Sequence, residues 1–289
     1  MLMRTTVRLL RIIGLLVLAV GLSACSAVKL GYGSAPQVVY WWLDGYLDFT
    51  DAQAPQVRDE LDRLHRWHRS TELPKLAALL QQASQLAPGD ISAPQACAVV
   101  NALRGRIGAV AQQAEPALAA VAPGLTAAQL EHLAQRYQRN DADFRKEWLD
   151  AGPAERAERR YRQWLERGES IYGALDDAQK AVLREQVAQS IFDPQLQAAE
   201  RQRRQRDALQ TLRQASAQPA QAAVLLRGYL LRTQDSPDPA WRNHRDQLLQ
   251  ESCRTFALLH ASTTPTQREA AARRLRAYQR DLMELAGGS

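Results

Sequence analysis

The stretch from Leu125 to Phe144, LTAAQLEHLAQRYQRNDADF, contains the two signals that decide the fold. Thr126 and, three residues later, Gln129 form a capping box. In such a box the threonine oxygen accepts the Gln129 amide and the glutamine side chain accepts the Thr126 amide. The apolar residues behind it recur at steps of three, four and seven, the period of an α-helix: Leu130, Leu133, Tyr137 and Phe144. The stretch therefore predicts an amphipathic helix with a defined first residue.

Four more capping boxes occur along the chain, at Thr50–Gln53, Ser92–Gln95, Asp176–Gln179 and Thr264–Gln267. Proline and glycine separate the helical segments, and no alternating, strand-like stretch competes with them. We expect helices, some of them merging with a neighbour, near 37–49, 51–70, 72–86, 94–121, 127–150, 154–172, 177–191, 195–215, 219–233, 239–261 and 265–286. The boxes are spaced too irregularly for a solenoid. The sequence thus predicts an all-α fold, an irregular antiparallel bundle of about nine to eleven helices.

The first 25 residues have the organisation of a bacterial export signal. Arg4, Arg8 and Arg11 precede a short apolar run, which is too short to cross about 30 Å of hydrocarbon. Leu22-Ser-Ala-Cys25 resembles the lipobox of bacterial lipoproteins, in which the cysteine takes a diacylglyceryl group, the chain is cut before it and an acyl chain such as palmitate is added. We predict a signal peptide over 1–24, a lipidated tether over 25–36 and a helical domain over 37–286.

The charge balance limits the partners. The formal net charge of +6 falls to +3 once the three signal-peptide arginines are removed, and such a mild charge disfavours a nucleic-acid partner. Ser26 follows the lipobox cysteine where an aspartate would retain a lipoprotein at the inner membrane in enteric-type systems. The sequence therefore predicts the periplasmic face of the outer membrane, with the membrane as one partner and envelope proteins as others.

Two cysteines remain in this oxidising compartment, Cys97 and Cys253. They could form a disulfide, which persists there. Alternatively Cys253 is simply a core residue, because it shares a helical face with Leu249 and Phe256, whereas Cys97 lies on the flank of its own apolar stripe. Zinc is disfavoured because no C-x-x-C spacing occurs.

The aromatic stretch YWWLDGYLDF, residues 40–49, poses a choice between core and contact surface. Val39, Trp42, Tyr46 and Phe49 are spaced by three, four and three, which favours a buried helical face. Trp41 lies on the flank and is the ring most available to a membrane or partner. We hold Trp41, Trp42 and Tyr46 as possible contact residues.

Other polar clusters are weaker candidates. His65, His68 and Glu72 share one helical face and could hold a metal, but the zincin spacing and a third strong ligand are missing. Asp44, Asp48 and Asp51 could act as an acid and base pair, although carboxylates are common at helix ends. Arg203 and Arg204 belong to a basic run, 201–206, that could touch anionic lipid or lie in solvent. We predict no catalytic residue, no metal and no cofactor.

The chain resembles a family of lipoproteins from Gram-negative proteobacteria that are grouped as a domain of unknown function. The likeness rests on the lipobox, on Trp42-Leu-Asp44 with the motif at 46–53, on the motif at 67–74, and on Asn140 with Phe144-Arg145. The resemblance implies a helical envelope protein and supplies no catalytic residues. A weaker likeness is the L-T-x-x-Q pattern of small periplasmic helical chaperones, which the capping boxes alone explain.

These observations predict a lipid-anchored, non-enzymatic envelope protein that acts as a scaffold or binding module. The alternative is a periplasmic chaperone-like or envelope-stress module. An apolar groove would favour the chaperone, a closed bundle with a charged surface would favour the scaffold, and a deep pocket with clustered Asp and His would favour an enzyme. The sequence does not name the partner or the oligomeric state.

Overall fold

The fold is all-α, as the sequence predicts. The computed structural model describes residues 31–287, and within that range it contains eleven α-helices and no strand. The predicted signal peptide and Cys25 lie outside the described residues. The helices are α2 Ala35–Leu47, α3 Ala54–Trp67, α4 Leu73–Leu86, α5 Ala93–Val121, α6 Ala127–Phe144, α7 Pro153–Tyr172, α8 Asp177–Ala188, α9 Pro194–Ala217, α10 Ala222–Gln234, α11 Pro239–Ala261 and α12 Pro265–Gly287.

The capping boxes form as the sequence predicts. Ser92, Thr126 and Asp176 each cap a helix with both reciprocal bonds of the box present. Thr264 makes the same two bonds with Gln267 at the start of α12. Thr50 and Gln53 also bond reciprocally, at 3.0 and 3.3 Å, although α3 becomes regular only at Ala54. Local side-chain chemistry therefore sets where these helices begin.

A π-helical turn joins α3 to α4, which the sequence predicts as neighbouring helices near 51–70 and 72–86. The turn is His68–Glu72, and the Leu73 amide donates to the His68 carbonyl five residues back. Pro74 follows immediately, and a proline in a regular helix has no amide to donate and clashes with the carbonyl four residues earlier. The wider turn lets the chain run on through the proline without ending the helix. A second π turn, Arg145–Leu149, ends the α6 segment.

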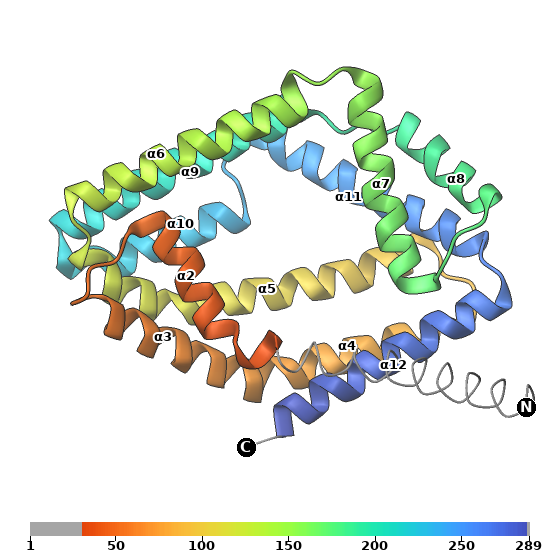
Figure 1. The fold of residues 1–289 in the computed structure, drawn as a ribbon, viewed down its shortest axis with the longest axis horizontal. Coiled ribbons are helices and arrows are strands. Elements are labelled where there is room, and N and C mark those ends of the chain that lie inside the picture. The colour runs from red at the N-terminus through yellow and green to blue at the C-terminus, as the bar shows by residue number, and fades with distance from the viewer. Residues whose placement is uncertain (1–30, 288–289) are drawn as a thin grey trace, which may run out of the picture.

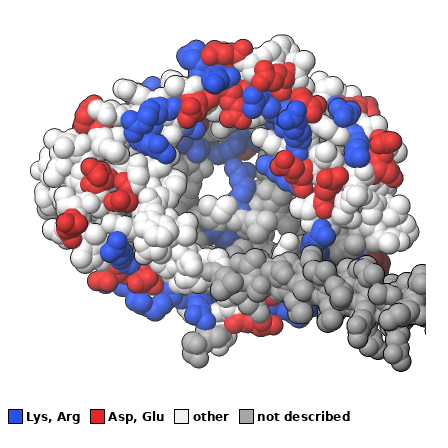
Figure 2. Space-filling model, viewed as in Figure 1, with Lys and Arg blue, Asp and Glu red and all other residues white. Residues whose placement is uncertain are grey.

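The helices are arranged around a central opening (Figure 1). α3, α4 and α12 form one long side, on which α12 packs along α4. α6 and α9 lie side by side on the opposite side, and α7, α8 and α11 close one end. α5 packs against α10 and α11, and α2 packs against α3 and α6. The space-filling view shows the molecule hollowed at its centre, so the bundle is open in the middle (Figure 2).

Two pairs of helix starts are joined by glutamine side chains. Gln53 and Gln129 donate to each other's side-chain oxygen, at 3.2 and 2.7 Å, and each also donates to a backbone carbonyl just before the other's cap. Gln179 and Gln267 repeat the arrangement at 2.7 and 3.0 Å. We call each pair a glutamine clasp. The first clasp joins the starts of α3 and α6, and the second joins the starts of α8 and α12.

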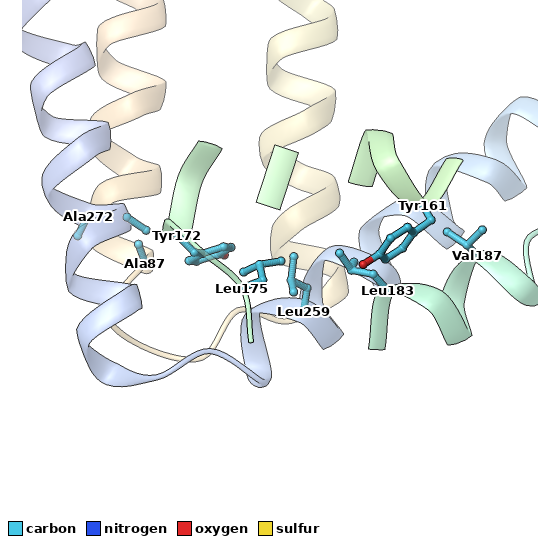
Figure 3. Packing of buried hydrophobic residues seen from close by; sticks show 9 residues of the cluster. Ala87, Tyr161, Tyr172, Leu175, Leu183, Val187, Leu259 and Ala272 are labelled. Carbon is cyan, nitrogen blue, oxygen red and sulfur yellow. The ribbon is translucent and has the colours of Figure 1, made fainter. Parts of the chain in front are cut away.

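The hydrophobic core is divided into separate clusters around the opening. The largest joins the end of α4 to α7, α8, α11 and α12, where Tyr172, Leu175 and Leu259 lie together (Figure 3). Smaller clusters centre on Ala215 and Leu226, on Tyr40 and Val57, and on the two cysteines. No helix in the range 31–287 is both long and apolar enough to span a membrane.

Candidate functional site

The aromatic helix α2 buries a different face from the one that its spacing predicts. Tyr40 is the buried ring, at 5% exposure, and packs with Ala54, Val57 and Phe49 against α3. Trp42, expected in the core, is 60% exposed, and its neighbour Trp41 is 62% exposed. The reason is that α2 has neighbours on two sides, α3 and α6, and the face between them borders a cavity. The prediction that Trp42 is a core residue is therefore wrong.

The cavity has a volume of about 540 Å³. It lies between α2, α6, α9 and α10, and single residues of α5 and α11 complete its wall. Its lining is mostly apolar or aromatic, with a group of charged side chains from α9. A volume of this size lies in the range of about 300–1,000 Å³ that is usual for small-molecule sites. We treat this cavity as the candidate functional site.

One wall of the cavity is aromatic. The Trp42 and Tyr46 ring centres are 4.9 Å apart, and those of Tyr46 and Tyr137 are 6.3 Å apart. Asn140 donates from its amide to the Tyr46 hydroxyl at 2.8 Å and so fixes that ring. Burial raises the pKa of the Tyr137 phenol, and the nearby Tyr229 and Tyr46 raise it further. The Tyr137 ring is therefore neutral at physiological pH, and the three rings together form a continuous aromatic surface.

The opposite wall carries an ion-pair network centred on Glu200, which is 3% exposed. Arg203 binds both Glu200 oxygens, at 2.8 and 3.0 Å, and Arg204 donates through Nε at 2.6 Å. Ser236 donates to the same carboxylate at 2.9 Å. Burial raises the pKa of Glu200, but these hydrogen bonds outweigh burial and hold it below the ordinary value. The side chain is therefore an ionised carboxylate with its acceptors filled.

The network explains where the basic run on α9 points. The sequence leaves open whether Arg203 and Arg204 meet anionic lipid or solvent, and the structure places both on Glu200 within the same molecule. Arg203 also lies 3.4 Å from Asp207, which Arg232 binds at 2.7 Å. Arg201, the residue after Glu200 on α9, donates through Nε to Asp141 at 2.7 Å. Arg203 is 20% exposed and is a structural ion-pair residue, whereas Arg201 and Arg204 line the cavity.

The histidine cluster does not assemble as a metal site. His65 Nε2 lies 3.1 Å from the Tyr32 carbonyl, and His68 Nδ1 lies 2.8 Å from the Tyr32 hydroxyl. Glu72, which is fully buried, pairs instead with Lys75 at 2.8 Å and Arg106 at 3.5 Å. Within residues 31–287 no three His, Cys, Asp or Glu side chains are grouped to hold a metal ion. The two histidines bind Tyr32, which the sequence assigns to the tether, so the body of the protein holds the chain from there onward.

Cys97 and Cys253 are joined by a disulfide, with their Cα atoms 5.4 Å apart. It ties α5 to α11 across 156 residues of sequence. Both cysteines are also buried, together with Ala96. The bridge is therefore part of a small hydrophobic cluster.

Most of the cavity residues carry no signal in the sequence that marks them as a site. Sequence patterns single out Trp42, Tyr46 and Arg204, but not Tyr137, Tyr229 or Trp241, which come from three other helices. Tyr137 was assigned to the apolar stripe of its helix, and it does lie there. A helical period identifies which residues face inward but does not distinguish a filled core from a cavity.

Comparison with known families gives one match. A family described as a family of unknown function (DUF6279) matches residues 45–236, well over half of the chain. The chain belongs to this family. The DUF6279 segment begins within α2 and ends after α10, so it supplies nearly all of the cavity wall and leaves α11 and α12 outside. No curated protein and no solved structure matches the chain significantly. The resemblance expected from the sequence is thus supported as an all-helical family of unknown function, and the lipobox and its motif stay predictions.

Proposed function

We propose that this protein is a lipid-anchored helical binding module of the bacterial envelope, facing the periplasm from the outer membrane and acting without catalysis. The observation that carries the proposal is the cavity between α2, α6, α9 and α10. Its lining is predominantly apolar, with a few polar groups at fixed positions, and that composition is typical of sites that bind a small molecule.

The state of the carboxylates favours binding over catalysis. A general base needs a free lone pair and a pKa near the working pH. The Glu200 oxygens accept four hydrogen bonds, from two arginines and a serine, and its pKa is lowered by them. Asp141 accepts from Arg201 at 2.7 Å and from Gln205 at 2.8 Å. Both carboxylates serve to orient arginines.

The position of α2 links the predicted anchor to the cavity. α2 begins at Ala35, about ten residues after Cys25, and carries one charged residue, Asp44. Ten extended residues span at most about 33–36 Å. A body tethered so closely has α2, with its exposed Trp41 and Trp42, near the bilayer. A ligand from the membrane surface, or an envelope protein, would then reach the cavity over a short path.

A crosslinking experiment in intact cells tests the proposal. A photoreactive phenylalanine replaces Trp42, at the cavity, and in a matched control it replaces Tyr278, an exposed aromatic residue of α12 outside the cavity. We expect a covalent adduct of defined mass from position 42 and none from position 278. Adducts at both positions, or at neither, would contradict a binding role for the cavity.

A chaperone-like module is the second candidate, and the exposed side chains Val38, Val39, Trp41 and Trp42 favour it. Such a patch could hold an unfolded client transiently. Its test is suppression of aggregation of a reduced, unfolding substrate protein. Under this alternative Trp41→Ala and Trp42→Ala weaken the suppression equally, whereas a cavity-binding module depends on Trp42 alone.

A further inference from the structure

The hydrogen-bond inventory of the cavity is unbalanced. The carboxylates are largely occupied: Glu200, which lines the cavity, accepts from Arg203, Arg204 and Ser236, and Asp141, which holds the lining residues Arg201 and Gln205, accepts from both of them. Both Glu200 oxygens are filled, and among the four carboxylate oxygens only Asp141 Oδ2 has no donor within residues 31–287. A ligand that needs many acceptors from the protein, such as a polyhydroxyl sugar, is therefore poorly matched.

Donors, in contrast, are left over. Arg201 and Arg204 are each held by a carboxylate through Nε, and their terminal Nη groups have no hydrogen-bond acceptor among residues 31–287. The side chains of both arginines are about one-third exposed, at 34% and 36%, so these groups can reach a ligand. Trp241 also lines the cavity, and its indole N–H is buried with no acceptor among residues 31–287. Surplus donors with positive charge select a ligand that brings acceptors and negative charge.

The rest of the lining is hydrocarbon. Leu133 and Leu226 are 3% and 2% exposed. Leucines from five helices contribute to the wall: Leu43, Leu47, Leu118, Leu133, Leu212 and Leu226. The rings of Trp42 and Tyr46 extend this surface toward the exposed face of α2. A small inorganic anion buries no apolar surface against such a wall. The wall therefore favours an anion that carries a hydrocarbon chain.

We propose that the cavity binds a single-chain anionic amphiphile, with its hydrocarbon chain along the leucines and its carboxylate or phosphate against the Nη groups of Arg201 and Arg204. The cavity volume of about 540 Å³ suits one chain with a small head group. Carboxylate oxyanions of fatty acids and phosphate oxyanions of lysophospholipids share this chemistry. The inference rests on the proposed binding function and names the class of ligand.

Photolabelling of the full lipidated chain in phosphatidylcholine nanodiscs tests the ligand class. The probe is palmitate carrying a diazirine in its chain, and labelled peptides are located by mass spectrometry. We expect label on the cavity segments of α6, α9 and α10, which lie away from the exposed face of α2.

Palmitate and palmitoyl lysophosphatidylglycerol should compete, and the stronger competitor distinguishes a carboxylate from a phosphate head group. Neutral monopalmitoylglycerol should compete about tenfold less well or worse, because it cannot form charge-assisted bonds with the arginines.

Matched variants separate the cavity from the rest of the surface. The double variant Arg201→Gln/Arg204→Gln should lower probe affinity about tenfold or more, whereas Arg206→Gln, an exposed arginine of the same helix outside the cavity, should leave it unchanged. Trp42→Ala, which leaves the ion pairs untouched, should also weaken labelling, and Trp41→Ala should not. Thermal melting of each variant checks that the fold is retained.

Three results would overturn the inference: label spread evenly over the surface, equal competition by neutral monopalmitoylglycerol, or unchanged labelling of the folded arginine variant. These failures are distinct from failure of the proposed function. If the crosslinker at position 42 still captures a defined molecule while the palmitate probe does not label the cavity, the cavity binds a ligand of another class.

Discussion

Glu200 organises one side of the cavity from a buried position. Its carboxylate lies between Arg203 and Arg204 on the same helix, three and four residues further on. A buried charge is tolerated only when its desolvation is offset by good hydrogen-bond geometry, and here every oxygen is bonded. Because these bonds lower the pKa of Glu200, its contribution to stability is fully present above the ordinary glutamate pKa of about 4.3. The contribution is lost only as the pH falls below that value.

Replacing this carboxylate should be costly. Glu200→Leu keeps a similar volume but leaves Arg204 without its carboxylate and Arg203 with Asp207 alone, and we expect the free energy of unfolding to fall by about 3 kcal/mol. Urea denaturation measures the change. The control is Glu158→Leu, which removes a partly exposed surface carboxylate paired with Arg162 and Arg184 and should cost about 0–1 kcal/mol. Equal losses in the two variants would show that the Glu200 network does not stabilise the fold as a buried network should.

At the scale of elements, the two glutamine clasps convert local capping into long-range contact. Each glutamine side-chain oxygen accepts a hydrogen bond from the backbone N–H of its own N-cap residue and one from the side-chain amide of the facing glutamine. Each side-chain amide donates to the oxygen of the facing glutamine and to a backbone carbonyl at the other helix start. Gln179 is 1% exposed, so its polar atoms depend on these partners. Helix starts that are 88 residues apart in sequence are thereby fixed to each other.

The clasps should therefore show energetic coupling. In a double-mutant cycle, Gln179→Ala and Gln267→Ala should deviate from additivity by about 0.5–3 kcal/mol, because each substitution removes the other's partner. The control cycle pairs Gln179→Ala with Gln95→Ala, since Gln95 caps only its own helix start. That cycle should be additive within about 0.5 kcal/mol in urea denaturation. Additivity in both cycles would mean that the clasp contacts contribute nothing beyond the caps.

The same local chemistry explains how far the sequence predicts the structure. Helix starts at Ser92, Thr126 and Asp176 were predicted because capping is decided within four residues. The sequence predicts two neighbouring helices here but not the π turn before Pro74, because only the surrounding packing makes continuation through the proline favourable. The buried face of α2 was also mistaken. Tyr40 and Trp42 are equally suited to a core by residue type, and neighbours distant in sequence decide between them.

At the scale of the whole molecule, the open centre divides the hydrophobic core, so other links must hold the structure together. The clusters around the opening are small and contain many alanines, such as Ala122, Ala215 and Ala222 in one of them. Each such cluster buries little apolar area. The cavity could not be predicted from sequence for the same reason: it depends on how six helices are placed, whereas each helix alone shows only an ordinary apolar stripe.

The disulfide is one of these links, and its removal should destabilise the whole molecule. Closing a loop across 156 residues stabilises a fold by roughly 5 kcal/mol in the chain-entropy model, and often by less in practice. We expect Cys97→Ser/Cys253→Ser to lower the unfolding free energy by up to about that amount, measured in urea. Thiol counting on denatured, unreduced wild-type protein provides the control. Two free thiols there would contradict a bridge in the native protein.

The predicted membrane anchor at Cys25 would set where this molecule works. Tyr32 is held by His65 of α3 and by His68 of the π turn that follows, so only residues 26–31 separate the predicted lipid from the body, a span of about 25 Å at most. A diacylglyceryl group with an added acyl chain buries enough CH₂ groups, at about 0.8 kcal/mol each, to make attachment effectively permanent.

We therefore expect Cys25→Ser to leave an unprocessed precursor that takes no label from a fatty-acid analogue. Wild-type protein should be recovered with the outer membrane on a density gradient, and Ser26→Asp should move it to the inner membrane. Labelling that survives Cys25→Ser would refute the anchor, whereas wild-type recovery with the inner membrane would refute only the sorting argument.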